Sequence, residues 1–297
     1  MGAPCGLLTM PILSLSKVSF RYPEQKRSAL TEVSLDIQKG EFLAILGGDG
    51  SGKSTLCKTL NGLIPHHVKG VFSGDVLLEG RSTRSTPVTE IATQVALSLQ
   101  DPEMQLFTDS VEEEAAFAPE NLALPWAEID ARVKRALHVT GLSSLREKSP
   151  SALSGGQKQR LAIASVVSML PSVLVLDEPL SMLDPRGRQE LLVMLDSLRR
   201  ERQITVIISS NTAEEIASHC DRIALLDRGR LLGVGSPAEM LTSSERLLEI
   251  GVEPPQLLEL SERLVASGFL REDQKFIGEE RGAEQLLSSL SKRGARP

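Results

Sequence analysis

The sequence predicts an α/β fold built around a mostly parallel β-sheet, and three observations indicate this class. First, short apolar runs alternate along the chain with stretches of helical periodicity, a pattern typical of central strands that helices cover on both faces. Second, a glycine-rich loop joins one such run directly to a helical stretch. Third, another run ends in two adjacent carboxylates. The runs are Phe42 to Leu46, Val95 to Gln100, "VLVL" at 173–176, Thr205 to Ser210 and "RIALLD" at 222–227.

The segments around these runs have other patterns. In the N-terminal part, "ILSLSKVSF", "VSLDI" and "GDVLLEG" predict short antiparallel strands. Between the second and third runs, an insert at about 102–168 is mostly helical. There Ser110 and Glu113 have the spacing of a capping box, and apolar residues recur every four positions from Ile129 to Leu137.

The pattern changes after Gly235. We expect residues 12–235 to form the main domain and residues 236–297 a small C-terminal extension, which could be a dimerisation element. The closing "SKRGARP" is expected to be frayed. The apolar residues expected on one helical face of the extension are Leu257, Leu260, Leu264 and Val265.

Composition and charge disfavour several classes of protein. The chain has 297 residues, 41% apolar and 24% charged, as in ordinary globular proteins with a full core. Its net charge of −6 disfavours a general nucleic-acid binder, because such proteins usually carry a basic face. The cysteines at positions 5, 57 and 220 are scattered, so no disulfide framework or metal-ligand spacing is predicted and a reducing compartment is favoured.

No membrane span is predicted. The longest apolar stretch, Leu161 to Leu176, is interrupted by Pro171 and is shorter than the roughly 18 residues that a span needs. The opening "MGAPCGLLTMPIL" lacks the basic start of a signal peptide and the hydroxyl residue of a myristoylation signal. We therefore expect a soluble chain, or one that a partner holds at a membrane.

The loop "GGDGSGKST" matches the phosphate-binding pattern G-x-x-x-x-G-K-[ST]. Its glycines let successive backbone N–H groups converge on phosphate oxygens, and the helix N-terminus adds partial positive charge. The lysine would neutralise the β- and γ-phosphates of ATP, and the next serine would bind Mg²⁺. A plain glycine-rich turn is the alternative, but the strand before the loop and the helix after it favour phosphate binding. The residues assigned here are Gly47, Gly48, Asp49, Gly50, Ser51, Gly52, Lys53, Ser54 and Thr55.

Two carboxylates, Asp177 and Glu178, follow the apolar run at 173–176. Placed beside the phosphate loop, Asp177 would hold Mg²⁺ through water while Ser54 binds it directly. Glu178 lies one residue further on, where a carboxylate can polarise the water that attacks the γ-phosphate. Solvated acids at a strand end are the alternative, and the phosphate loop upstream favours the functional interpretation.

The segment "LSGGQKQR", which precedes this strand by one helical stretch, resembles the signature motif of ATP-binding cassette (ABC) proteins. The resemblance covers about Ile12 to Gly235. It implies a P-loop NTPase (ABC ATPase) core with an antiparallel β subdomain and a helical signature subdomain. It also implies that the signature, at a helix N-terminus, caps the γ-phosphate bound by a partner subunit, whereas without the other motifs it would be interpreted as a flexible helix cap. The residues in this role are Ser154, Gly155, Gly156 and Gln157.

Other positions resemble functional residues of the family. Tyr22 in "FRYP" matches the aromatic that stacks on adenine, although a lone tyrosine is more often a core or surface residue. Gln100 matches the Q-loop glutamine that senses Mg²⁺ and the attacking water; alone it would be a strand-end cap. "SMLD", Ser181 to Asp184, resembles the D-loop that crosses the dimer seam, so Asp184 is assigned to the shared site.

One position departs from the family pattern. After the run at 205–210 the family has a histidine that contacts the γ-phosphate, and this chain has Asn211. Asparagine can still donate a hydrogen bond, but it is shorter and never carries the imidazolium charge. We therefore expect slower hydrolysis at the site built on Lys53, and a partner cassette that carries the histidine. The alternative is that asparagine substitutes adequately.

The segment "SLQDPEMQLFTDSVEEEAAFAPENL" closely resembles the same region of energy-coupling-factor (ECF) type ATPases. That resemblance implies an ATPase at the cytoplasmic face of the membrane that energises import of a vitamin or transition-metal ion. The implied partners are a second, non-identical ATPase subunit, a transmembrane coupling subunit and a substrate-binding membrane subunit, with no nucleic acid. In that family the segment forms a groove for coupling helices; for the acidic cluster Glu112 to Glu114, a solvated helix face is the alternative.

A soluble cassette protein that acts on ribosomes or DNA is the competing hypothesis. Ribosome-acting members of the ABC family usually carry two cassettes in one chain, and DNA-repair members split the cassette with long coiled coils. This chain has one cassette motif set, no heptad run and an acidic net charge of −6. These features favour the importer, although fold alone does not decide function.

Overall fold

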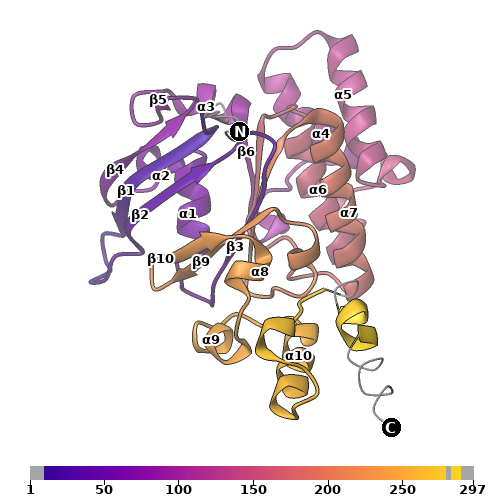
Figure 1. Ribbon diagram of the computed structural model, residues 1–297. Coiled ribbons are helices and arrows are strands. Elements are labelled where there is room, and N and C mark those ends of the chain that lie inside the picture. The colour runs from indigo at the N-terminus through magenta and orange to yellow at the C-terminus, as the bar shows by residue number, and fades with distance from the viewer. Residues whose placement is uncertain (1–9, 279–281, 289–297) are drawn as a thin grey trace, which may run out of the picture.

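The computed structural model describes residues 10–278 and 282–288, which form two β-sheets flanked by helices (Figure 1). The strands are β1 (Leu13–Arg21), β2 (Leu30–Ile37), β3 (Phe42–Leu46), β4 (Val71–Leu78), β5 (Arg81–Ser82), β6 (Val95–Ser98), β7 (Val173–Leu176), β8 (Thr205–Ser210), β9 (Arg222–Asp227) and β10 (Arg230–Gly235). The 4-stranded sheet has the order β2-β1-β4-β5 and is antiparallel. The 6-stranded sheet has the order β10-β9-β3-β8-β7-β6, in which only β10 pairs antiparallel.

The parallel sheet forms the centre of the molecule because its strands are buried on both faces. All residues of β3, β7 and β8 are buried, as the continuous apolar runs predict. The helices between residues 111 and 202 stand on one side of this sheet, and the antiparallel sheet lies on the other (Figure 1). The helices are α1 (Lys53–Leu60), α2 (Leu63–His66), α3 (Val88–Gln94), α4 (Val111–Asn121), α5 (Trp126–Val139), α6 (Gly155–Val167), α7 (Pro185–Arg202), α8 (Pro237–Met240), α9 (Ser244–Glu249) and α10 (Gln256–Ala266).

The predicted α/β class and its parallel strands are confirmed, with two local differences. β6 ends at Ser98, so Gln100 lies beyond the strand rather than at its last residue. The edge strand β10 was not predicted, because two glycines interrupt its alternation of apolar residues and the strand is only partly buried. Both differences concern strand ends and edges, where local pattern is weakest.

The predicted helical insert has its own small core. Helices α4, α5 and α6 pack on buried residues that include Val111, Val133 and Leu161. The Ser110 hydroxyl accepts a hydrogen bond from the Glu113 N–H at 3.2 Å, which is one half of the predicted capping box. The boundaries 102–168 and 12–235 stay predictions.

The acidic cluster in the first turn of α4 is not a free solvated face. Glu114 is 2% exposed, and its Oε2 accepts hydrogen bonds from the N–H groups of Phe107 and Thr108 and from the Thr108 hydroxyl. Glu112 forms an ion pair with Arg146. Two of the three carboxylates therefore hold the local fold together.

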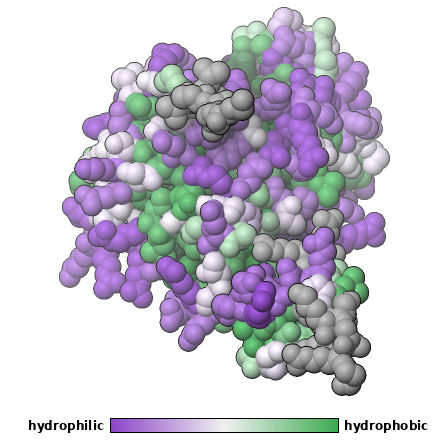
Figure 2. Space-filling view, in the orientation of Figure 1, coloured by the Kyte–Doolittle hydropathy of each residue, from purple (hydrophilic) through white to green (hydrophobic). Residues whose placement is uncertain are grey.

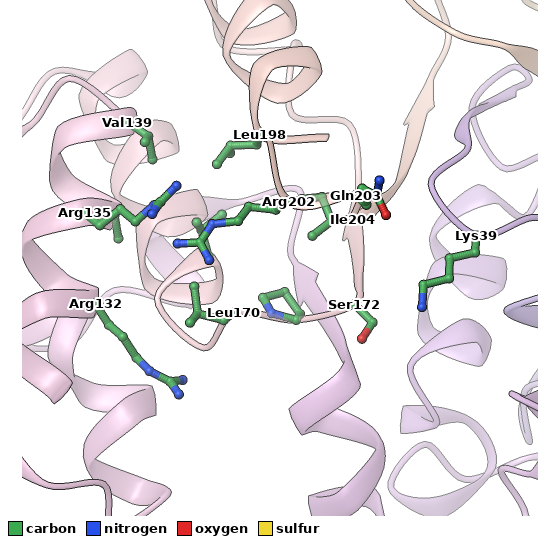
Figure 3. Close-up of a pocket in the computed structure, with 13 residues that line it drawn as sticks. Lys39, Arg132, Arg135, Val139, Leu170, Ser172, Leu198, Arg202, Gln203 and Ile204 are labelled. Atoms are coloured by element: carbon green, nitrogen blue, oxygen red, sulfur yellow. The ribbon is translucent and has the colours of Figure 1, made fainter. Parts of the chain in front are cut away.

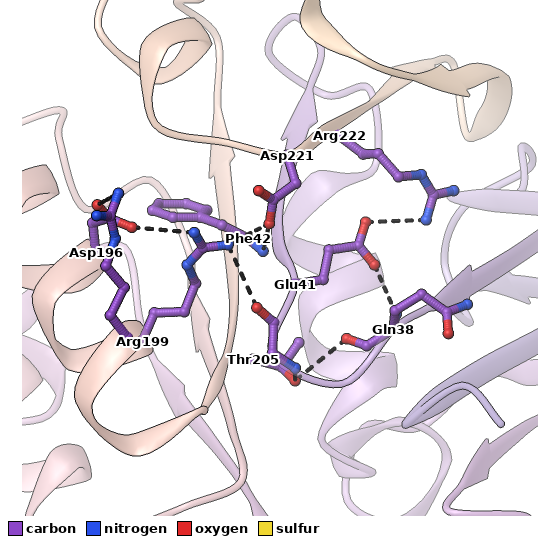
Figure 4. A network of polar contacts seen from close by, with 10 residues as sticks. Gln38, Glu41, Phe42, Asp196, Arg199, Thr205, Asp221 and Arg222 are labelled. Atoms are coloured by element: carbon purple, nitrogen blue, oxygen red, sulfur yellow. Dashed lines mark hydrogen bonds and ion pairs between the residues drawn. The ribbon is translucent and has the colours of Figure 1, made fainter. Parts of the chain in front are cut away.

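A polar network joins the amino ends of the parallel strands to α7 (Figure 4). The buried Glu41 carboxylate accepts from the Gln38 N–H at 2.7 Å and pairs with Arg222 at 3.0 Å. Asp221 accepts from the Phe42 N–H at 2.8 Å and pairs with Arg199. These bonds satisfy polar groups at strand ends that would otherwise be buried without partners.

The C-terminal extension packs beneath the main domain (Figure 1). On α10 the fully buried positions are Leu258 and Ser261, whereas Leu260 is 43% exposed. The predicted apolar face is therefore wrong at Leu260 and omits Leu258, whereas the other predicted residues, Leu257, Leu264 and Val265, are half-buried. Apolar residues gather over the lower end of the face shown in Figure 2, where the extension lies.

Two sequence predictions on the chain ends lie outside the described residues, namely the frayed segment "SKRGARP" and Cys5. Within residues 10–278 and 282–288, the helices are all too short or too polar to cross a bilayer.

Candidate nucleotide site

The candidate site lies at the carboxyl ends of neighbouring parallel strands. The phosphate loop follows β3, Gln100 follows β6, Asp177 and Glu178 follow β7, and Asn211 follows β8. These strands are adjacent in the sheet, so their carboxyl ends meet at one edge. Ligands of open α/β sheets bind at this edge, and the sheet brings these residues together although they are far apart in sequence.

The phosphate loop bends through residues that tolerate left-handed backbone. Gly50 has φ 72° and Gly52 has φ 107°, conformations that glycine adopts without steric cost. A Cβ on Gly52 would lie 2.4 Å from the Ala29 carbonyl oxygen, so only glycine fits there. Helix α1 begins at Lys53, directly after the loop.

Lys53 is held inside the loop that it follows. Its Nζ donates to the carbonyl oxygens of Gly47 at 2.8 Å and Gly48 at 3.0 Å. It also lies 3.0 Å from Glu178 Oε1, with the two side chains 4% and 12% exposed. A lysine braced in this way presents its ammonium at a fixed point of the cleft.

The two carboxylates have different surroundings. Asp177 is 3% exposed, and its Oδ1 accepts from the Ser209 hydroxyl at 2.7 Å. The same hydroxyl accepts from the Glu178 N–H at 3.0 Å, which helps to hold Glu178 at φ 47°. This left-handed backbone is uncommon for a residue with a side chain. No sequence motif marks Ser209, because it lies within the apolar run of β8.

Gln100 joins the same cluster from the neighbouring strand. Its Nε2 donates to Glu178 Oε2 at 2.8 Å, so Glu178 is held by Lys53 on one oxygen and by Gln100 on the other. Tyr22 lies against helix α1, with its hydroxyl 3.2 Å from the Thr55 hydroxyl. Its ring packs edge-on against Phe20 with the centroids 4.9 Å apart.

These side chains surround an open cleft of about 940 Å³. The predicted residues that line it are Tyr22, Asp49, Gly50, Gly52, Lys53, Ser54, Thr55, Gln100, Glu178 and Asn211. Arg27, Arg228 and Arg230 also line it. These three arginines lie outside any motif, and only the basic pair Lys26-Arg27 in the sequence indicates a cationic surface there. With Lys53 they make the cleft cationic, which suits a triphosphate.

The residues assigned to Mg²⁺ have the right chemistry for it. A hydroxyl from Ser54, an amide from Gln100 and a carboxylate from Asp177 are oxygen donors, which this hard cation prefers. The described residues contain no group of three or more His, Cys, Asp or Glu side chains able to hold a metal. Mg²⁺ is commonly bound by one or two carboxylates together with water and substrate phosphates, so a donor set with one carboxylate and two neutral oxygens fits.

The signature residues line a different cleft. Ser154 caps α6, accepting from the Gln157 N–H at 3.3 Å while the Gln157 side chain accepts from the Ser154 N–H at 3.0 Å. A second cleft of about 520 Å³ is lined by Ser154, Gly156, Gln157 and Asp184 and by none of the residues that line the cationic cleft. Asp184 caps α7 by accepting from the Gly187 N–H at 2.7 Å. The phosphate loop and the signature residues, the two sets of predicted phosphate contacts, therefore line different clefts of the chain.

A third hollow of about 290 Å³ lies between α5, the end of α7 and Lys39 (Figure 3). Arg132, Arg135 and Arg202 line it together with apolar residues that include Val139, Leu170 and Leu198. Arg132 and Arg135 are paired with Glu128 and Glu201 respectively. None of the predicted site residues lines it.

Comparison with known proteins identifies the family. The sequence profile described as "ABC transporter" matches residues 30–181. A putative ABC transporter ATP-binding protein of Pyrococcus abyssi is 45% identical over 262 residues, covering 88% of this chain and 94% of that protein. The energy-coupling factor transporter ATP-binding protein EcfA2 of Clostridium tetani is 37% identical over 281 residues, covering 94% of this chain and 96% of that protein.

A solved structure agrees with the sequence matches. The cbiO1 protein of Clostridium perfringens, described as part of the ABC transporter complex cbiONQ, superposes with a TM-score of 0.71 at 34% identity, covering 81% of this chain and 94% of that one. Family profile, relatives and fold point to the same assignment. The chain therefore belongs to the ATP-binding proteins of ABC transporters, the family of ATPases whose hydrolysis is coupled to transport.

Proposed function

We propose that this chain is an ATPase subunit of an ECF-type importer, acting with Mg²⁺ on ATP at the cytoplasmic face of the membrane. The relatives named EcfA2 and cbiO1 support this placement. The transported solute is proposed to be a vitamin or a transition-metal ion. Its recognition is assigned to a separate membrane subunit, as the resemblance to ECF-type ATPases implies.

The observation that carries the proposal is the separation of the two clefts. Lys53 and Glu178 line one cleft, and Ser154 and Gly156 line the other. A nucleotide held by Lys53 would need its γ-phosphate closed by the signature turn of a second subunit. ATP would then bridge the two chains, which gives the closed pair the differential affinity that a ligand-driven switch needs.

In the proposed chemistry each residue of the cationic cleft has one task. Lys53 and the loop amides bind the β- and γ-phosphates, and Glu178 orients and polarises the attacking water. Ser54 and Asp177 would hold Mg²⁺, which neutralises developing charge on the phosphates. Tyr22 is assigned to the adenine. Gln100 donates a hydrogen bond to Glu178 at 2.8 Å. A movement of Glu178 would therefore also move Gln100 and the segment that follows Gln100 in the chain.

Four exposed apolar side chains follow Gln100 in the chain and support a membrane partner. Met104 is 78% exposed, Phe107 64%, Phe117 42% and Trp126 72%. The Phe107 and Phe117 rings pack edge to face with their centroids 4.6 Å apart. Large apolar side chains grouped at the surface mark an interaction site, here proposed to receive coupling helices of a transmembrane subunit.

Asn211 suggests that the two ATPase subunits are not identical. It lines the cleft beside Lys53 and Glu178, where the family has a histidine. We propose a partner ATPase that carries this histidine, so that one composite site hydrolyses ATP faster than the other. Nucleic acid is not a proposed partner.

Affinity purification of the tagged chain from detergent-solubilised membranes tests the proposal. The expected result is recovery of an integral membrane protein and a second ATPase, and ATP hydrolysis by the assembly. Recovery of ribosomes or DNA, with no membrane protein, would overturn it in favour of a soluble cassette protein.

A further inference from the structure

The turn that ends α9 touches the phosphate loop directly. The carbonyl oxygen of Ile250 accepts a hydrogen bond from the Gly48 N–H at 2.9 Å. The fit is tight, because a Cβ on Gly48 would lie 2.7 Å from that oxygen and 3.0 Å from the Gly251 Cα. The C-terminal extension therefore packs directly against the loop that the sequence assigns to phosphate binding.

Gly48 is held through both of its backbone polar groups. Its N–H is bonded to Ile250 of the extension, and its carbonyl oxygen accepts from Lys53 Nζ at 3.0 Å. A displacement of Gly48 would therefore also move one of the anchors of Lys53. Only Gly48 separates Ile250 from Lys53, the residue assigned to the ATP phosphates.

The same turn holds the segment that carries Asn211. The Glu253 N–H donates to the Asn211 carbonyl oxygen at 2.8 Å, and the Ala213 N–H donates to the Glu253 carbonyl oxygen at 3.0 Å. These bonds form an isolated parallel bridge between Thr212 and Glu253. Four consecutive residues, 250–253, thus contact both the phosphate loop and the segment after β8.

Local structure makes this turn rigid. Gly251 has φ 74°, its N–H bonds to the Leu248 carbonyl at 3.0 Å, and the Val252 N–H bonds to the Leu247 carbonyl at 2.9 Å. This is the Schellman pattern, in which a glycine closes a helix and leaves the carbonyl before it free for other partners. Leu247 and Val252 are 2% and 0% exposed and belong to the main core, so the turn is fixed to the domain.

We propose that residues 247–253 of the C-terminal extension are a positioning element of the ATP site, setting the phosphate loop through Gly48 and Asn211 through Glu253. The inference rests on the proposed function of the cleft. It gives the extension a role within one chain, separate from any role in dimerisation. Gly251 and Glu253 act here through their neighbours and are positioning residues.

The first test compares two glycines of the extension that have the same backbone conformation. Gly251→Ala places a Cβ 2.9 Å from the Gly48 Cα, whereas at Gly268, with φ 71°, a Cβ meets nothing within 4 Å. Both variants carry the same left-handed strain, so their difference isolates the contact. We expect Gly251→Ala to raise the KM for MgATP about fivefold, the value of roughly one hydrogen bond, with kcat changed less, and Gly268→Ala to leave the KM unchanged.

The second test removes one donor from the turn. Glu253→Pro lacks the N–H that bonds the Asn211 carbonyl, whereas Glu253→Ala keeps it and alters only an exposed side chain. We expect Glu253→Pro to lower kcat about fivefold with little change in KM, and Glu253→Ala to behave as wild type. A general loss of folded protein would not lower kcat in Glu253→Pro alone while the KM for MgATP stays nearly unchanged.

A third measurement needs no nucleotide and separates this inference from the proposed function. Amide hydrogen exchange of the segment containing Gly48 should be slow in wild type and in Gly268→Ala, and faster in Gly251→Ala. Equal exchange and equal KM in the two glycine variants would overturn the inference, and so would wild-type constants in Glu253→Pro. Should Gly251→Ala fail to fold, the Glu253 pair decides. Failure of the wild-type assembly to hydrolyse ATP would refute the function instead, and leave the exchange result standing.

Discussion

Lys53 and Glu178 form an ion pair at the centre of the candidate site, with Nζ 3.0 Å from Oε1 and both side chains nearly buried. The pair joins the phosphate loop after β3 to the carboxylates after β7, two segments more than a hundred residues apart in sequence. The lysine is assigned to binding the ATP phosphates and the glutamate to polarising the attacking water. Replacing each residue in turn therefore tests one task at a time.

Lys53→Ala is expected to weaken MgATP binding by about a hundredfold, the upper range for hydrogen bonds to charged groups. It also leaves Glu178 without its cation in a nearly buried position. Isothermal titration calorimetry measures the change. Lys58→Ala is the matched control, since Lys58 lies on the same helix but does not line the cleft, and equal loss in both variants would contradict the role of Lys53.

Glu178→Gln is expected to keep MgATP affinity within a few-fold of wild type and to lower kcat on the order of a hundredfold or more, as for loss of a general base. The amide retains the size of the side chain and can still contact Gln100 and Lys53. Steady-state ATPase assays with the purified assembly check this. A variant that hydrolyses ATP at the wild-type rate would remove Glu178 from the chemistry.

Gly155→Arg tests the shared site without damaging the fold. A Cβ on Gly155 meets nothing within 4 Å, so the added side chain should project from the first turn of α6 toward a partner. We expect normal MgATP binding to the isolated chain and loss of ATPase activity in the assembly. Ser154→Ala is a useful comparison, because loss of the cap costs only about 1 kcal/mol of stability. Unchanged activity of Gly155→Arg in the assembly would contradict the two-chain site.

Asn211→His is expected to raise the turnover at the site built on Lys53, on the order of tenfold, because a charge-assisted hydrogen bond to the γ-phosphate is about twice as strong as a neutral one. ATPase measured with the partner's own site inactivated reports this site alone. The absence of any gain would show that asparagine substitutes adequately for the family histidine.

The pH dependence of stability offers a test of the network in Figure 4. Burial raises the pKa of Glu41 above its ordinary value of 4.5, against the opposing effects of the Gln38 N–H and Arg222. The folded state therefore binds more protons than the unfolded state, and this group lowers stability as the pH rises from 4.5 through the raised pKa. Glu41→Gln should reduce this decline in urea unfolding at a series of pH values.

Glu239→Gln serves as a control of opposite sign for that experiment. Hydrogen bonds from Ser236 lower the pKa of Glu239, so its stabilising contribution is present above pH 4.5 and is lost as the pH falls through the lowered pKa. If the free energy of unfolding of Glu41→Gln changed with pH as it does in the wild type, the burial of the Glu41 carboxylate in the folded protein would be contradicted.

The sequence by itself determined the α/β class, the phosphate loop, the paired carboxylates and the signature turn. Each of these depends on short-range pattern, such as glycine spacing in the loop or the apolar run before Asp177, because local backbone conformation and strand burial follow from neighbouring residues. The wrong details, the end of β6 and the buried face of α10, lie where local pattern is weak.

Only the tertiary structure decided which distant groups meet at the site. Ser209 bonds both Asp177 and Glu178, Arg228 and Arg230 line the cleft, and Ile250 bonds Gly48, yet none of these lies in a motif. Their positions follow from strand order, sheet register and the packing of the extension, which are set by the burial of the whole core. Long-range contacts of this kind leave no periodic trace in the residues that make them.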